Sequence, residues 1–243
     1  MIRPLALAAA LAAAPAAALA TDASVSTDYL ISIAGLEIGE IAVQYEEVGG
    51  AYALNLDGGF RFLFISGAAE GRVTGAKEED GFAPTSYRLR FDGPTREVIS
   101  DIRFEGGRPD AWSIMPEPEP EWMEGRIPLA DSDMPGAVDP VSAFLVPAAS
   151  AAEACTRQQK VFSGFVRFDL TLTPGAPEAN GVIPCKVSYE PISGHRIDSE
   201  GVARLRAGQG LEVSMAELAP GVWAPHYLGF GTPVGTLTFE RKN

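Results

Sequence analysis

The sequence predicts a mostly β protein arranged as an antiparallel meander, with one or two short helices around residues 140–158. Two observations predict this class. Apolar and polar residues alternate in successive short segments, and turns rich in Gly or Pro separate these segments. One stretch, DPVSAFLVPAASAAEAC from Asp139 to Cys155, instead has the capping residues and spacing of helix.

The first predicted hairpin covers residues 28–47, where apolar residues alternate on both sides of Gly35. AYALNL and FRFLFISG follow, and Asp57-Gly58-Gly59 is predicted to form the tight turn between them. SYRLRF and REVISDIRF continue the meander. The strands predicted after Cys155 are VFSGFVRFDLTLTP, with a bulge near Gly164 or burial on both faces, then VIPCKVSYEPISGHR, VARLRAG, LEVSMAEL and GTLTFERK.

The helical stretch contains two helix starts. Asp139 is a good N-cap, and Pro140 suits the first helical position because its missing N–H costs nothing there. Ser150 and Glu153 form a capping box, which predicts a second short helix that carries Cys155. The first helix is predicted to end at Pro147 and to have one apolar face, made of Val141, Phe144 and Leu145.

The only two cysteines are Cys155 and Cys185, and an even count in an exported protein favours a disulfide. A free reduced pair is the next alternative. Metal binding is the last, because two cysteines and two distant histidines supply few ligands. A bridge closing a loop of about 30 residues would stabilise the fold by roughly 3 to 4 kcal/mol.

The N-terminus has the pattern of a signal peptide. Arg3 precedes an apolar run that ends in Ala18-Leu19-Ala20, which predicts cleavage after Ala20 and export to the periplasm. An uncleaved anchor is the alternative, but Pro15 interrupts the apolar run. Residues 21–243 are then expected to form a single β-rich domain, with no transmembrane segment in the mature chain.

The formal net charge of −13 argues against nucleic acid as a partner and against anionic lipid head groups. No catalytic or cofactor motif is recognisable. G-x-S-x-G is absent, His195 and His226 are each predicted to be loop histidines rather than general bases, and no cofactor is expected. A hydrolase built on acidic residues and His226 remains an alternative.

Two features are candidates for binding. Phe60, Phe62 and Phe64 are in phase, which predicts a core-packing face of the sheet or, alternatively, a wall for an apolar ligand. The acidic, Pro-rich segment within 110–139 is predicted to be an extended loop on which Trp112 and Trp122 either dock against the sheet or form a partner-binding strip.

Calcium binding by Asp131, Asp133 and Asp139 is a weaker alternative. An EF-hand loop would require Asp or Asn at position 135, where this chain has Pro. We therefore predict no metal site.

The ordered set YLISIAGLEIGEIAVQY, DPVSAFL, KVFSGFVRFDL, CKVSYEPISGHR and TPVGTLTF resembles the family called domain of unknown function 3108, which contains exported proteins of Gram-negative bacteria. Ser163, Phe165 and Val166 depart from the Asp-Gly-Arg-Arg that is common there. The resemblance implies a single curled antiparallel sheet, of the spiral or half-barrel β-roll type, and no established activity.

These observations together predict a periplasmic, non-enzymatic cell-envelope protein that binds an apolar or lipid-like ligand in its concave sheet. The first alternative is a structural or protein-interaction module that uses loop 115–139 to contact an envelope protein. The second is the hydrolase.

Overall fold

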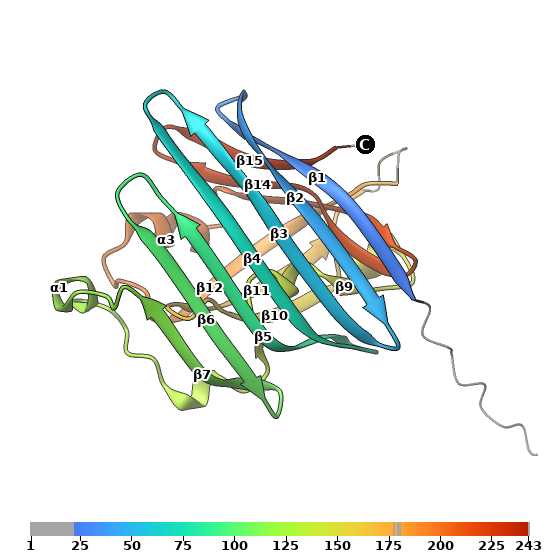
Figure 1. Cartoon of the computed structure of the whole chain (residues 1–243), viewed down its shortest axis with the longest axis horizontal. Helices are drawn as coiled ribbons and strands as arrows, with labels where there is room; N and C mark the ends of the chain where they lie inside the picture. The colour runs from blue at the N-terminus through green and yellow to red at the C-terminus, as the bar shows by residue number, and fades with distance from the viewer. Residues whose placement is uncertain (1–21, 177, 179–180, 243) are drawn as a thin grey trace, which may run out of the picture.

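The computed structural model describes residues 22–242 except 177, 179 and 180, and it is mostly β (Figure 1). The strands are β1 (Ala23–Ile33), β2 (Leu36–Val48), β3 (Ala51–Phe62), β4 (Ile65–Glu78), β5 (Gly81–Asp92), β6 (Glu97–Glu105), β7 (Arg108–Met115), β8 (Ala137–Val138), β9 (Val146–Pro147), β10 (Arg157–Phe162), β11 (Arg167–Pro174), β12 (Ile183–Ser193), β13 (Leu211–Ala219), β14 (Val222–Thr232) and β15 (Gly235–Arg241). The helices are α1 (Pro120–Met123), α2 (Ala151–Ala154) and α3 (Glu200–Arg206), and the 3-10 turns are η1 (Asp131–Asp133) and η2 (Ser142–Phe144).

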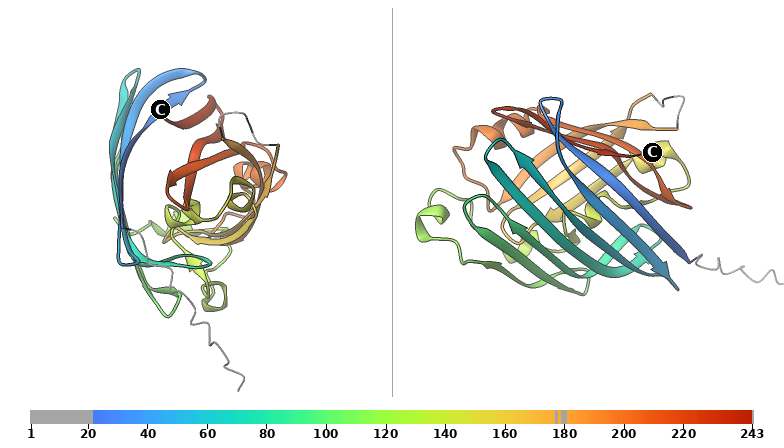
Figure 2. Two further views of the ribbon diagram at one scale, coloured as in Figure 1. Left: turned by 90° about the vertical axis from the view of Figure 1, so that its right-hand side faces the viewer. Right: turned by 45° about the horizontal axis from the view of Figure 1, so that its top comes forward.

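The strands form one curled sheet, in the order β7-β6-β5-β4-β3-β2-β1-β15-β14-β13-β12-β11-β10-β8. Neighbouring strands are antiparallel except β8 and β10. Strands β1 to β7 form one long wall, and β10 to β15 curl around to face it (Figure 2). The turn before β8 reaches back to the β6–β7 turn, where the Gly136 amide donates to the Gly107 carbonyl at 2.9 Å. The predicted curled antiparallel architecture is therefore confirmed, and the sheet is nearly closed.

Side chains fill the seam between β7 and β10. The indole of Trp112 on β7 packs edge-on against Phe162, with ring centroids 5.1 Å apart. The Ser100 hydroxyl on β6 donates to the Ser163 carbonyl at 2.9 Å. These contacts join the two ends of the sheet through packing rather than through a continuous ladder of backbone hydrogen bonds.

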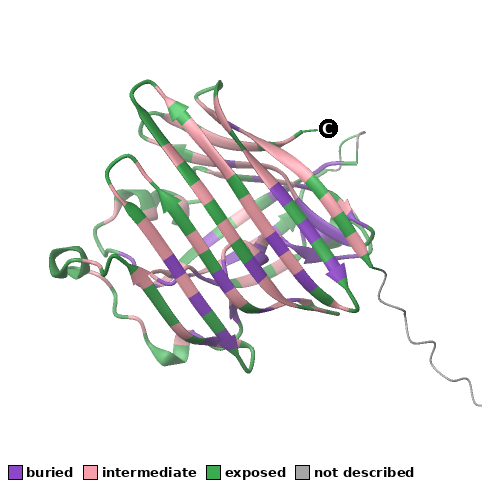
Figure 3. Ribbon diagram, in the orientation of Figure 1, coloured by how far each residue is buried: buried purple, intermediate pink, exposed green. Residues whose placement is uncertain are grey.

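Buried and exposed residues alternate along the strands of the long wall (Figure 3). At one end of the interior, Tyr45, Tyr52 and Phe82 pack edge to face, with centroid distances of 6.2 and 4.7 Å to Phe82. The Tyr45 hydroxyl donates to the buried Glu47 carboxylate at 2.7 Å, and Lys77 pairs with the same carboxylate at 2.9 Å. Side chains therefore fill this end of the barrel-like interior.

The helical patch is shorter than predicted but uses the predicted caps. Asp139 Oδ1 accepts hydrogen bonds from the Val141 and Ser142 amides, both at 2.9 Å. The segment that follows makes one 3-10 turn, η2, and then the two-residue strand β9 pairs with β14. Ser150 caps α2 by accepting from the Glu153 amide at 3.3 Å.

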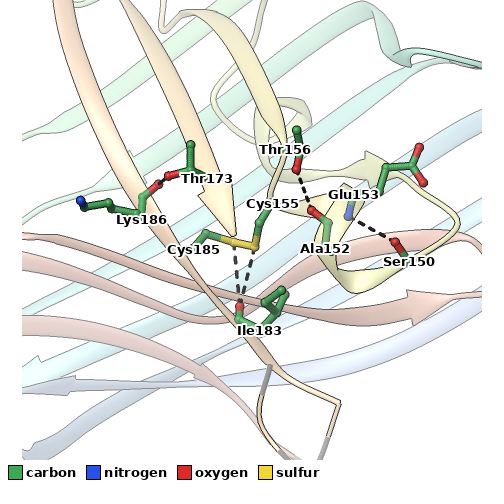
Figure 4. The surroundings of a disulfide bond; sticks show 9 residues. All are labelled: Ser150, Ala152, Glu153, Cys155, Thr156, Thr173, Ile183, Cys185 and Lys186. Carbon is green, nitrogen blue, oxygen red and sulfur yellow. Dashed lines mark hydrogen bonds between the residues drawn. A yellow bond between two sulfur atoms is a disulfide. The ribbon is translucent and has the colours of Figure 1, made fainter. Parts of the chain in front are cut away.

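The two cysteines are placed as a disulfide pair. Cys155 ends α2 and Cys185 lies on β12, with Cα atoms 5.4 Å apart (Figure 4). Both are buried in a cluster that contains Met215 and Trp223, and the Trp223 indole N–H donates to the Ala148 carbonyl at 3.1 Å. The pair therefore fixes α2 against the second half of the sheet.

The turn predicted at Asp57-Gly58-Gly59 is wrong. These residues lie inside β3, and the chain reverses at Leu63 and Phe64. The glycines are required by close approach of the neighbouring strand: a Cβ on Gly58 would lie 2.6 Å from the Ile41 Cα. Lack of space for a side chain, rather than a turn, explains the Gly pair.

Three other predicted segments also need correction. The segment VFSGFVRFDLTLTP is split into β10 and β11 by a turn that contains Gly164, with φ 88°; of the two predicted alternatives, burial on both faces is found at Val161 and Phe162. VARLRAG, predicted as a strand, lies mostly in α3, which Ser199 caps by accepting from the Val202 amide at 3.3 Å. Residues 110–115 belong to β7 and not to a loop.

The predicted signal peptide, residues 1–20, lies outside the described residues. Among the helices of the described residues, none is long and apolar enough to cross a membrane.

Candidate functional site

The interior of the curled sheet contains two adjoining apolar cavities. The rim cavity, about 390 Å³, lies at the end of the long wall where β1 meets β2 and β3 meets β4. The inner cavity, about 420 Å³, lies beside the middle of the same strands. Both cavities are lined by Ile41 and Phe239, so they adjoin.

The rim cavity is lined by apolar residues alone. The sheet supplies its walls through the face that alternation turns inward. Its principal residues are Ile31, Ile33, Ile38, Phe60, Phe62, Ile65, Phe91 and Leu237.

Small residues leave the rim cavity open. Gly58 on β3 and Ala69 on β4 are paired directly, and Ala69 is also paired with Phe91 on β5. Directly paired residues share one face of a sheet, so these positions all face inward. The volume that a larger side chain would fill at Ala69 is part of the cavity, whereas Gly58 lines the cavity and has no room for a side chain.

The inner cavity has a floor made by the helical patch. Pro140, Val141, Phe144 and Leu145 close it from the side opposite β2, β3 and β5. Tyr29 and Tyr87 bring hydroxyl groups to its lining, and the Tyr29 hydroxyl donates to the Pro225 carbonyl at 2.6 Å. Thus the stretch from Asp139 to Leu145, which stood out in the sequence, forms part of the candidate site.

The predicted aromatic stripe is only partly correct. Phe60 and Phe62 line the rim cavity, and Phe60 stacks with Phe91 at a centroid distance of 6.4 Å. Phe64 is not in phase with them because it lies in the β3–β4 turn, where it is 99% exposed. The misplaced turn at residues 57–59 caused this error.

The loop 115–139 holds the other predicted binding candidate. Trp112 packs against Phe162, so docking against the sheet, one of the two alternatives predicted for it, is what the structure has. Trp122 lies on α1, is 47% exposed, and stacks with the Arg96 guanidinium 4.1 Å from the ring centroid. The loop also contains η1 and β8, so it is not extended throughout.

The two histidines lie in different environments. His195 is buried, its Nε2 lies 3.2 Å from the Tyr189 hydroxyl, and burial lowers its pKa. His226 lies within β14 and not in the predicted loop, and it lines a surface pocket of about 590 Å³ together with Glu212 and Glu240, whereas His195 does not line this pocket. The geometry therefore does not bring the two histidines into one site.

Asp139 is an unusual charged group, which the sequence analysis treated as a helix cap and, as a weaker alternative, as a calcium ligand. It is completely buried, it precedes the cavity-lining residues Pro140 and Val141 in the chain, and its Oδ2 has no hydrogen-bond partner among the described residues. Burial raises its pKa to about 6, against the opposing effect of hydrogen bonds from Ser142 and Val141. The same carboxylate raises the pKa of Tyr52 and Tyr87 further, beyond the effect of their own burial.

The described residues contain no group of three His, Cys, Asp or Glu side chains placed to hold a metal ion. Asp131 pairs with Arg108 on the surface at 3.4 Å, whereas Asp139 is buried. The three aspartates considered for calcium are therefore not gathered into one site.

Comparison with known proteins gives no match: no family model, no curated protein and no solved structure is similar to this chain. Function is therefore inferred from the cavities and from the residues that line them.

Proposed function

We propose that this chain is a periplasmic, non-enzymatic cell-envelope protein that binds an apolar or lipid-like ligand inside its curled sheet. The two adjoining cavities of about 390 and 420 Å³ carry the proposal. The predicted export signal supports the compartment.

The lining selects the chemistry of the ligand. Each cavity falls within the range of about 300 to 1,000 Å³ that is typical of small-molecule sites. Burial of each methylene gains about 0.8 kcal/mol, whereas a polar group without a partner would lose free energy in the same place. With Tyr29 and Tyr87 as the hydroxyl-bearing side chains of the lining, an alkyl chain fits better than a polar metabolite.

A cavity-filling variant tests the proposal. Ala69→Trp would place an indole in the rim cavity, while Ala76→Trp on the same strand β4 is exposed and serves as a matched control. We expect native mass spectrometry of the mature protein, purified from the periplasm, to show a copurified apolar mass. We also expect uptake of the neutral dye N-phenyl-1-naphthylamine to fall at least several-fold in Ala69→Trp and not in Ala76→Trp.

Two results would contradict the proposal. One is a bare protein mass together with no dye uptake by the wild type. The other is equal uptake by Ala69→Trp and the wild type, because a dye bound outside the cavity would not respond to this change.

The interaction module is the second candidate, because Trp122 presents an indole on the surface of α1. Deletion of residues 117–124 should then abolish capture of an envelope partner. If capture is unchanged by the deletion, the loop is not the contact. The hydrolase built on acidic residues and His226 stays a prediction, and His226 lines a surface pocket together with Glu212 and Glu240.

A further inference from the structure

Three neighbouring turns at one end of the sheet expose large apolar side chains. The order β4-β3-β2-β1-β15-β14 puts the β3–β4, β1–β2 and β14–β15 turns side by side along this end, and Figure 1 shows the first two together at the top of the long wall. We call these three turns the apolar tips. Their exposed residues and exposed fractions are Leu36 58%, Leu63 72%, Phe64 99% and Val234 68%.

The apolar tips border the rim cavity. Ile33, Phe62 and Ile65, which line this cavity, are sequence neighbours of the tips. The Ala34 amide donates to the Thr236 carbonyl at 3.0 Å, which joins the β1–β2 turn to the base of the β14–β15 turn. The exposed apolar surface and the apolar cavity are thus continuous along the chain.

The three apolar tips contain no charged residue. In the described segments 33–36, 62–65 and 232–235, which make the tips, every residue is uncharged. Charged residues begin at the next turn of the same end, because the β5–β6 turn lies between Asp92 and Glu97 and contains Arg96. In a chain that is 21% charged, the absence of charge lowers the cost of removing the three tips from water.

Leu63 adds a second observation. It has φ 55°, in the left-handed region that favours Gly or Asn. A Leu at this position costs stability and exposes apolar surface, and Phe64 beside it is almost completely exposed. Local strain held at an exposed position is more readily explained by a contact made outside the chain than by folding.

We propose that the apolar tips dock onto the surface of a lipid bilayer, so that the rim cavity faces the acyl region from which its ligand would come. The part of this proposal that concerns the ligand rests on the proposed function. Apolar side chains of this kind enter the boundary between head groups and acyl chains, about 5 to 10 Å deep. The formal charge of −13 excludes electrostatic recruitment, so we expect docking on zwitterionic lipid and weaker docking on anionic lipid.

A bilayer fits the shape of this end better than a protein partner does. The tips project as separate turns and do not form the continuous surface of about 800 Å² per partner that a specific protein interface needs. A fluid lipid surface can enclose separate tips individually.

Vesicle flotation with paired variants tests the proposal. Leu63→Gly/Phe64→Ser removes two tip side chains without packing loss, and Gly relieves the strained φ, so its melting temperature should equal or exceed that of the wild type. Val48→Ser is the matched control, because Val48 is an apolar residue of similar exposure, 65%, at the opposite end of β2. With phosphatidylcholine vesicles we expect about tenfold or greater loss of binding for the double variant and none for Val48→Ser.

Phe64→Trp provides a direct reporter of insertion. The emission of the introduced indole should shift to the blue and be quenched by brominated phosphatidylcholine, after subtraction of the wild-type signal. The proposal is overturned if the wild type does not float with phosphatidylcholine, if it requires anionic lipid, if the double variant floats like the wild type, or if the emission of the Phe64→Trp variant does not change. Retained uptake of N-phenyl-1-naphthylamine from solution in these cases would leave the proposed ligand cavity intact while refuting docking.

Discussion

Removal of the Asp139 charge should change how stability depends on pH. The folded protein holds this carboxylate without exposure to water, and its pKa rises from 3.8 to about 6. A raised pKa means that the folded state binds the proton more tightly than the unfolded chain does. Stability is therefore greatest when Asp139 is protonated and falls as pH rises from about 4 to about 6.

The size of the effect follows from the shift. Each pKa unit corresponds to about 1.4 kcal/mol, so a rise of roughly two units costs the wild type about 3 kcal/mol of unfolding free energy at neutral pH. Asp139→Asn removes the charge and keeps an oxygen to accept from the Val141 and Ser142 amides. The variant should resemble the wild type near pH 4 and exceed it by up to about 3 kcal/mol near pH 7.5.

Urea unfolding of both proteins across this range measures the difference. Low protein concentration is needed because the sequence pI is about 4.6. Asp57→Asn on the exposed side of β3 is the control, and its pH profile should follow the wild type. Destabilisation of Asp139→Asn by the same amount at both pH values would refute the reasoning, because the carboxylate would then contribute through capping alone.

Three further variants test the disulfide, a buried ion pair and an exposed ion pair. Cys155→Ala/Cys185→Ala should lose about 3 to 4 kcal/mol, or roughly 7 to 14 °C in Tm; equal melting of the wild type with and without reductant would contradict this. Arg167→Met should lose about 3 kcal/mol in urea unfolding, because the buried Arg167 guanidinium donates to the Asp133 carbonyl at 2.8 Å and pairs with Asp169 at 2.6 Å. Arg88→Met, which breaks the exposed pair with Asp101, should cost less than about 1 kcal/mol, and an equal loss in both would show that burial is irrelevant.

The strands and the caps were predictable because their causes are local. Alternation across residues 28–47 reflects a pleated strand with one face inward, and the structure forms β1 and β2 there. Asp139 and Ser150 cap their turns through backbone amides two or three residues away. Such contacts need no knowledge of the rest of the fold.

The segment VARLRAG was predicted wrongly for a different reason, because its local pattern fits both a strand and a helix. VARLRAG alternates like a strand, but Val202 and Leu205 are also three residues apart, as on one face of a helix, and Ser199 supplies the cap. Contact with β12 and β13 through a hydrophobic cluster that includes Val202 and Leu205 selects the helix. The alternation alone could not distinguish the two.

The location of the candidate site depended on one turn. In an antiparallel meander, the turns after β1 and β3 lie at one end and those after β2 and β4 lie at the other, so correct turn positions suffice to sort the chain by end. With the turn assigned to Asp57-Gly58-Gly59, the β3–β4 tip would have consisted of one acidic residue and two glycines. Its true position at Leu63 and Phe64 makes the tip apolar and shortens the aromatic stripe to Phe60 and Phe62. The information missing from the sequence was the close approach of β2 to Gly58, and this contact determines both the cavity wall and the tip.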